Sequence, residues 1–141
     1  MSKIFGLMFL IFSAFAFAAE EKIKVVYHCD YDDEKRYNLM LDNIRYQAEL
    51  YDANMQEFEI AVVTNGACAK LLDKTQASKS IIEKAKARID AFGIKFLVCE
   101  LGMKFHNVKK ENLIDNVGFI ELGLAEITKM QHEGYAYIKI Q

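Results

Sequence analysis

Apolar and polar residues alternate along the chain in blocks that predict strands separated by helices. Some blocks are short and apolar nearly throughout, as in buried parallel strands, whereas others repeat apolar residues every three or four positions, as amphipathic helices do. The predicted strands are residues 23–29, 58–64, 94–99, 117–120 and 135–140. The predicted helices are residues 34–52, 67–72, 80–92, 110–114 and 122–133. The pattern predicts an α/β fold: one domain with a mostly parallel five-stranded sheet and helices on both faces, in flavodoxin-like layering.

Local signals mark the ends of these helices. The acidic run at residues 30–33 precedes the first helix and offers a cap where the helix dipole favours negative charge. Ser80 and Glu83 have the spacing of a capping box, and Gly93 follows the last apolar residue of that helix. The acidic run could instead bind a metal ion, but no glycine-punctuated calcium loop follows it, so we expect caps and no metal.

The N-terminus has the features of a secretory signal peptide. Lys3 precedes a mostly apolar run that ends in Ala-Phe-Ala at residues 16–18, the small-x-small form that signal peptidase cleaves. The alternative is a membrane anchor, but a span needs about 20 apolar residues, and two glutamates follow at 20–21. We therefore expect residues 1–18 to be removed on export to the periplasm, leaving a soluble domain of residues 19–141 with no membrane association.

Composition restricts the class of function. The chain has 141 residues, 52% hydrophobic and 27% charged, with a formal net charge of -2, which is typical of one globular domain. Lys and Arg do not cluster, so we expect no nucleic-acid partner. No cofactor-binding motif is evident, since the single glycine of the Asn65-Gly66 turn does not make a phosphate loop.

The three cysteines, Cys29, Cys68 and Cys99, are the main candidates for chemistry. An odd number in an oxidising compartment leaves at least one thiol unpaired in a monomer, and the spacings fit neither a CxxC motif nor a zinc site. Cys99 ends the third predicted strand, and ligands of parallel α/β sheets gather just beyond the carboxyl ends of the strands. It is either a nucleophile or sulfur carrier, or a small buried hydrophobe.

Several short motifs resemble the exported branch of the DsrE/DsrF-like family. They are collinear over most of the chain after residue 19: Val26-Tyr27-His28, Asp30-x-Asp32-Asp33, Asn43-Ile44, Phe96-Leu97-Val98-Cys99 and Gly134-Tyr135-Ala136-Tyr137-Ile138-Lys139. The resemblance implies a five-stranded, mostly parallel sheet, shared with sulfur-relay subunits and YchN-type proteins. It also implies a homo-oligomer, trimer or hexamer, which the aromatic-rich composition favours because apolar surface should be left over.

The resemblance also implies which residue carries sulfur. The exported branch commonly has a cysteine at the position of Cys99, which would accept a persulfide sulfur from an unidentified donor protein and pass it to an unidentified acceptor. A hydroxyl residue usually follows three positions later, and here Gly102 replaces it, which leaves backbone N–H groups to stabilise a thiolate. Lys104 and His106 follow closely enough to supply positive charge, or are solvated loop residues.

The remaining candidates lie on other strands and turns. His28 matches the family pattern and either lines the same crevice or is a structural histidine bonded to the backbone. We expect Cys29 to face the opposite side of the sheet from His28, the Asn65-Gly66 turn to face a ligand, and Cys68 to serve in packing. If the strand order is 2-1-3-4-5, Cys29 and Cys99 end neighbouring strands and are candidates for a disulfide-forming pair.

Two classes of function follow from these features. One is a periplasmic sulfur-handling protein in which Cys99 carries a persulfide or exchanges thiols, with sulfurtransferase-like activity. The other is a non-catalytic oligomeric module that binds a small ligand or a partner, with Cys99 structural.

Overall fold

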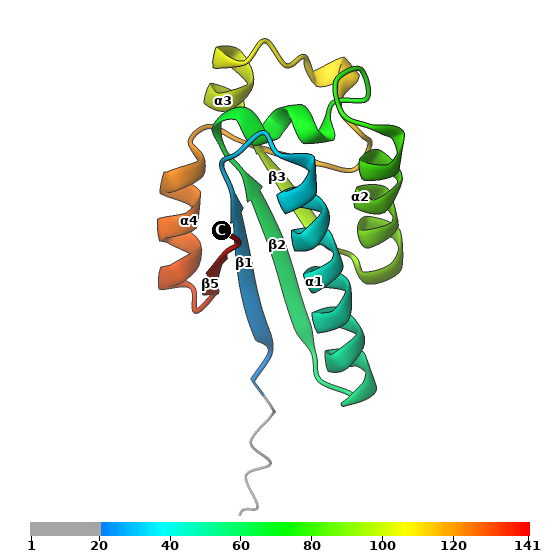
Figure 1. The fold of residues 1–141 in the computed structure, drawn as a ribbon. Helices are drawn as coiled ribbons and strands as arrows, with labels where there is room; N and C mark the ends of the chain where they lie inside the picture. Colours follow the sequence, from blue (N-terminus) through cyan, green and yellow to red (C-terminus); the bar gives the residue numbers. More distant parts are fainter. Residues whose placement is uncertain (1–20) are drawn as a thin grey trace, which may run out of the picture.

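The computed structural model describes residues 21–141, which form a five-stranded sheet that is parallel throughout, in the order β4-β3-β2-β1-β5 (Figure 1). The strands are β1 (Ile23–Cys29), β2 (Phe58–Thr64), β3 (Lys95–Cys99), β4 (Gly118–Ile120) and β5 (Ala136–Lys139). The helices are α1 (Glu34–Ala53), α2 (Lys79–Phe92), α3 (Glu100–Phe105) and α4 (Gly123–His132), with 3-10 helices η1 (Gly66–Leu72) and η2 (Lys110–Asn112). The predicted fold class is confirmed.

The strand order 2-1-3-4-5, on which the Cys29–Cys99 hypothesis depended, is wrong. The chain moves in one direction from β1 through β2 and β3 to β4, and only the last crossover returns, placing β5 beside the other edge of β1. Because crossovers are right-handed, steps in one direction put α1 and α2 on one face, and the return puts α4 on the other. Both orders obey this rule, so the alternation of elements does not distinguish them.

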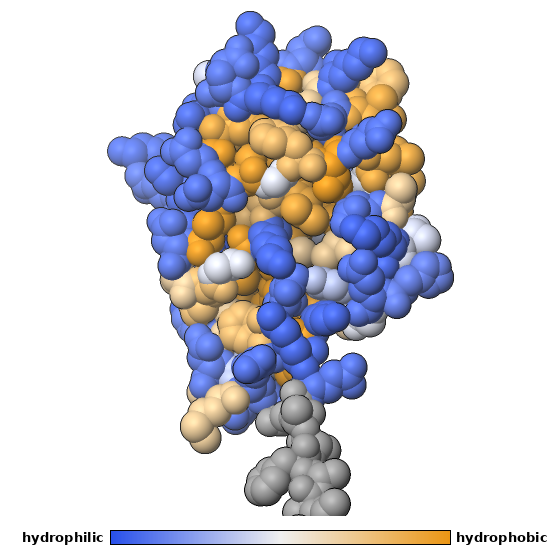
Figure 2. All heavy atoms as spheres, turned by 180° about the vertical axis from the view of Figure 1, so that it is seen from behind, coloured by the Kyte–Doolittle hydropathy of each residue, from blue (hydrophilic) through white to orange (hydrophobic). Residues whose placement is uncertain are grey.

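The two faces of the sheet carry cores of different size. Along β1, Val25 and Tyr27 belong to the large core under α1, α2 and η1, whereas Val26 belongs to a small core under α4. The period of two along a strand produces this separation. The small core consists of Val26, Ala61, Val63, Ile127 and Met130, with Leu97, Ile120 and Tyr135 at its margin. The α4 face therefore has the smaller core. In the view from behind, apolar side chains reach the surface in the upper half of the molecule, at the end where α3 lies (Figure 2).

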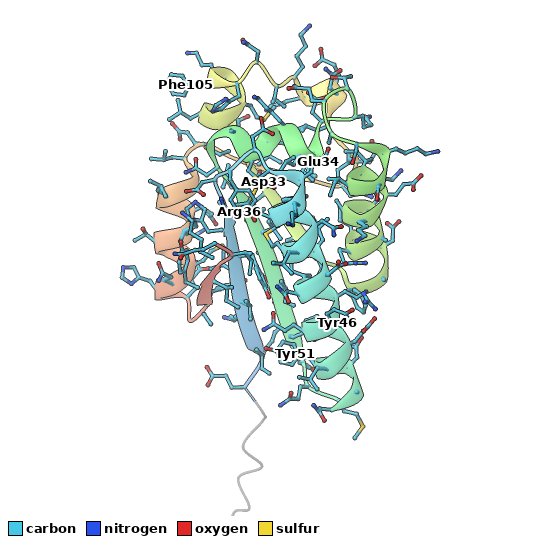
Figure 3. The ribbon with its side chains drawn as sticks, in the orientation of Figure 1. Asp33, Glu34, Arg36, Tyr46, Tyr51 and Phe105 are labelled. Carbon is cyan, nitrogen blue, oxygen red and sulfur yellow. A yellow bond between two sulfur atoms is a disulfide. The ribbon has the colours of Figure 1, made fainter. Side chains whose placement is uncertain are left out.

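Side-chain caps start the two long helices. Asp33, labelled in Figure 3, accepts hydrogen bonds from the N–H groups of Lys35 and Arg36 at the start of α1. At α2 the cap is Ser78, whose Oγ accepts from Ile81 N at 3.4 Å. The predicted capping box beginning at Ser80 is wrong, because α2 begins one residue before it, after a polar run that offers several possible caps.

Within residues 21–141, no helix has both the length and the apolar character that crossing a membrane requires. The predicted signal peptide, residues 1–18, lies outside the described residues. Among the described residues, no group of three or more His, Cys, Asp or Glu side chains is arranged to hold a metal ion.

Candidate functional site

Cys99 lies at a direct transition from strand to helix. It is the last residue of β3 and the N-cap of α3, and its Sγ accepts a hydrogen bond from Gly102 N at 3.4 Å. The sequence pattern did not predict α3, because six residues that include a glycine do not establish a helical period. The helix begins where the strand ends, so the sulfur lies among the unpaired N–H groups of its first turn.

A second helix also begins at this sulfur atom. Gly123 N, at the start of α4, donates to Cys99 Sγ at 3.3 Å, and the thiol lies 3.8 Å from the carbonyl oxygen of Glu121. The N-cap residue of α4 is Leu122, whose side chain makes no capping hydrogen bond. The Cys99 sulfur therefore acts as a cap for two helices, and both helix dipoles favour negative charge at its position.

Cys99 is the free cysteine of the chain and is fully buried. A pocket of about 330 Å³ lies beside the segments that enclose its sulfur. Its lining residues are Glu100, Leu101, Lys104, Glu121 and Leu122. The pocket thus borders the cover of the thiol, which consists of α3 and the Glu121–Leu122 segment. A reagent can reach Cys99 only if one of these two segments moves.

The Asn65-Gly66 turn packs directly against both donors. A Cβ atom added to Gly102 would lie 2.8 Å from Gly66 N, and one added to Gly123 would lie 3.2 Å from Asn65 Cβ. Asn65 Oδ1 accepts from Gly66 N at 3.0 Å, and Gly66 has a φ of 53°, in the left-handed region. The structure therefore brings Asn65, Gly66 and Gly102 together with Cys99.

Lys104 and His106 lie further along α3. Lys104 is exposed in the pocket wall, and the half-buried His106 is the C-cap residue of the helix. Among the described residues, the hydrogen-bond partners of Cys99 Sγ are backbone groups, and neither side chain is one of them. Beyond them Phe105, labelled in Figure 3, projects from α3 with 74% of its surface exposed.

His28 belongs to a different polar cluster. Strand β2 separates β1 from β3, so His28 and Cys99 are not neighbours across the sheet. The Nδ1 atom of His28 lies 2.9 Å from Tyr137 Oη, its side chain is buried, and its Nε2 atom has no hydrogen-bond partner among the described residues. Burial lowers the pKa of His28 below its ordinary value, while Asp30 raises it and Lys139 lowers it.

This environment predicts a pH dependence of stability. The unfolded chain binds a proton at His28 more readily than the folded chain, so the free energy of unfolding should fall as pH drops below about 6.5. Urea titrations between pH 7.5 and 5 should show a smaller fall in His28→Gln, while the exposed-site control His132→Gln should behave as wild type. An identical fall in all three proteins would show that His28 does not contribute.

Cys29 pairs with Cys68, not with Cys99. The disulfide has a Cα–Cα distance of 5.8 Å and joins the end of β1 to η1. The hypothesis of a Cys29–Cys99 pair is wrong, because β2 lies between the two strands and Cys29 is bonded to Cys68. The expected packing role of Cys68 is also too simple, since it is buried as one half of a covalent link.

Gly123 and Glu121 are site residues that the sequence analysis missed. Their signal is the start of α4: the sequence Glu121-Leu122-Gly123 provides no Ser, Thr, Asp or Asn as a cap. A helix that begins in this way leaves its first N–H groups for a partner elsewhere. Here that partner is Cys99.

The fold and site define a small parallel α/β protein whose free thiol ends an interior strand, between two helix N-termini. The family model of the DsrE/DsrF-like family matches residues 7–140, and the chain belongs to this family. Membership indicates a function related to sulfur relay. No curated protein matches the chain.

Two solved structures share the fold. The protein of unknown function MTH1491 from Methanobacterium thermoautotrophicum has a TM-score of 0.69 and 24% identity, covering 84% of this chain and 99% of that one. The ychN protein from E. coli has a TM-score of 0.63 and 13% identity, covering 83% and 98%. At these identities the likeness establishes the fold alone.

Proposed function

We propose that this protein handles sulfane sulfur outside the cytoplasm, with Cys99 carrying the sulfur as a persulfide. The observation that carries the proposal is the position of Cys99. It is the unpaired thiol of the chain, at the carboxyl end of an interior parallel strand, and two N–H donors at helix starts point at its sulfur. Family membership supports the same chemistry.

The proposed transfer has two balanced steps. The Cys99 thiolate attacks the sulfane sulfur of a donor persulfide, forming an Sγ–S bond while the donor S–S bond breaks and a donor thiolate leaves with the electron pair. A thiolate on an acceptor then attacks the outer sulfur, and Cys99 leaves as the thiolate. Gly102 and Gly123 N–H groups stabilise the negative sulfur at the start and end of the cycle.

One observation favours a second candidate function. Cys99 has no exposed surface, and its sulfur is enclosed by hydrogen-bonding backbone groups. These features also suit a non-catalytic oligomeric module that binds a small ligand or a partner, with Cys99 as a structural cap for α3 and α4. Alkylation of the folded protein separates the candidates, because a carrier thiol reacts through opening of its cover, whereas a structural one reacts only after global unfolding.

Cys99→Ser should leave the fold intact and abolish sulfur loading. The serine Oγ can accept the same two N–H groups, so we expect the free energy of unfolding to change by about 1 kcal/mol or less. After incubation with inorganic polysulfide and removal of the excess, intact mass should show one added sulfur atom on wild type and none on Cys99→Ser. Absence of the addition on wild type, or a loss of several kcal/mol in the variant, would contradict the carrier function.

We also propose export to the periplasm with removal of residues 1–18. The pattern of Lys3, the apolar run and the Ala-Phe-Ala site supports it, and so does the Cys29–Cys68 disulfide, since such bonds persist in oxidising compartments. N-terminal sequencing of protein purified from its own cells should begin near Ala19. A retained Met1 would contradict export by this route.

We propose further that the chain forms a homo-oligomer, trimer or hexamer. Large apolar side chains are exposed beside the Cys99 pocket and on the nearby helices α3 and α4; they are Leu101, Phe105, Leu122 and Leu124. Figure 2 shows apolar surface in the upper half of the view from behind. Light scattering at micromolar concentration should give a multiple of the monomer mass, and a monomer would contradict the proposal.

A further inference from the structure

The Cys29–Cys68 disulfide is connected to the Cys99 site through the Asn65-Gly66 turn. Asn65 N donates to the carbonyl oxygen of Cys29 at 2.7 Å, and Cys68 N donates to the carbonyl oxygen of Asn65 at 3.2 Å. The disulfide joins the same two parts of the chain covalently. Cys29 is the last residue of β1, and Cys68 lies in the first turn of η1. The turn and the start of η1 are therefore held to the end of β1 by one hydrogen bond and by one covalent bond.

The Asn65-Gly66 turn also supports both N–H donors of the Cys99 sulfur. Gly102 packs on the backbone of Gly66 with no room for a Cβ atom, and Gly123 packs on the Asn65 side chain. The carbonyl oxygen of Asp30, the residue after Cys29, lies 3.9 Å from a Cβ placed on Gly66. Displacement of the turn would remove the surface on which the starts of α3 and α4 rest.

We propose that the Cys29–Cys68 disulfide positions the Asn65-Gly66 turn so that access to Cys99 depends on the redox state of this pair. With the disulfide formed, the turn holds α3 and the start of α4 closed over the sulfur. With the pair reduced, the turn is held to β1 by hydrogen bonding alone, and the cover opens more often. This regulation rests on the proposed function for the identity of the group that Cys99 carries. Access to Cys99 itself is measured by alkylation, without any sulfur transfer.

The reductant is a dithiol, and the exchange balances. One thiolate of the dithiol attacks a sulfur of the Cys29–Cys68 bond, forming a mixed disulfide and releasing the other cysteine as a thiolate that takes up a proton. The second thiolate of the dithiol then attacks the reagent's own sulfur in the mixed disulfide. The reagent departs as an intramolecular disulfide, and the second cysteine leaves as a thiolate that takes up a proton. Two electrons pass to the protein and two thiols form.

A double variant tests the proposal cleanly. In oxidised wild type and in Cys29→Ala/Cys68→Ala alike, Cys99 is the one free thiol of the chain, so intact mass after iodoacetamide treatment reports on Cys99 alone. We expect Cys99 in the double variant to react about tenfold faster or more, because local opening controls the labelling of a buried group. Equal rates in the two proteins would overturn the proposal.

The matched control separates positioning from general loss of stability. Ile44→Ala truncates a fully buried side chain of α1 in the large core, a change that costs about 2–5 kcal/mol. Because Ile44 is not part of the turn, its truncation should leave the Cys99 rate within about twofold of wild type under native conditions. An acceleration equal to that of the double variant would show that the disulfide acts only through stability.

A second measurement covers the case in which the double variant does not fold. Wild type treated with dithiothreitol is labelled with iodoacetamide, and the peptide that contains Cys99 is quantified by mass. Faster labelling of that peptide after reduction supports the proposal, and an unchanged rate overturns it. Polysulfide loading of oxidised wild type is measured separately. If the protein never forms a persulfide but Cys99 is labelled faster after reduction, the disulfide controls access to Cys99 and the carrier function is wrong.

Discussion

Replacing Cys29 and Cys68 together by alanine should lower the free energy of unfolding by about 4 kcal/mol. The disulfide joins residues separated by 39 positions, and closing a loop of this length removes much conformational entropy from the unfolded chain. Both cysteines are fully buried, so the alanines also leave a small void in the core. Urea titration of wild type and variant, both free of reductant, measures the difference.

The same titration has two internal checks. Wild type in excess dithiothreitol should approach the stability of the double variant, while Cys99→Ser should stay close to oxidised wild type. A difference below about 1 kcal/mol between wild type and the double variant would show that the bond does not constrain the unfolded chain as the loop-closure argument requires.

Replacing Gly102 by alanine should destabilise the protein by about 2–3 kcal/mol. The new Cβ atom would lie 2.8 Å from Gly66 N and 3.1 Å from Gly66 O, and both are backbone atoms that cannot rotate away. Relief requires α3 to move off the turn, which weakens the hydrogen bond from Gly102 N to the Cys99 sulfur. We therefore expect faster alkylation of Cys99 as well as a lower free energy of unfolding.

Gly118→Ala is the matched control for this change. Its Cβ would lie at a similar distance, 2.9 Å, but from the Cδ2 atom of Leu97, the mobile end of a side chain that can change rotamer. We expect a cost below about 1 kcal/mol and no effect on the alkylation rate. Equal effects of the two substitutions would contradict the tight contact between Gly102 and the Asn65-Gly66 turn.

The fold was predictable because its strands and helices have different apolar periods. Five short apolar blocks become the five strands, and β3 ends at Cys99 as the pattern predicted. Strand order was not predictable, since the direction of each crossover leaves no mark on hydropathy. The helix α3 was missed because it has only six residues and follows a strand without a connecting loop.

The site was predictable in part. The strand-end position indicated Cys99, and the resemblance implied that Gly102, in place of a hydroxyl residue, would leave backbone N–H groups to hold the sulfur; the Gly102 contact has this form. The second donor, Gly123, lies 24 positions away in sequence and becomes a neighbour only through the β3–β4 pairing. The pairing of Cys29 with Cys68 could not be deduced from spacing, because three cysteines allow three different pairs.

The most direct test of the carrier function is the state of Cys99 in the protein as its own cells make it. Protein purified under iodoacetamide, with the alkylated Cys99 peptide analysed by mass, reports whether an extra sulfur lies between Cys99 and the alkyl group. We predict that a fraction of the peptide from wild type carries one added sulfur atom, removable by dithiothreitol, with the Cys29–Cys68 peptide pair unmodified. Cys99 found only as the plain alkylated thiol, in cells supplied with a sulfane sulfur source, would contradict the central claim.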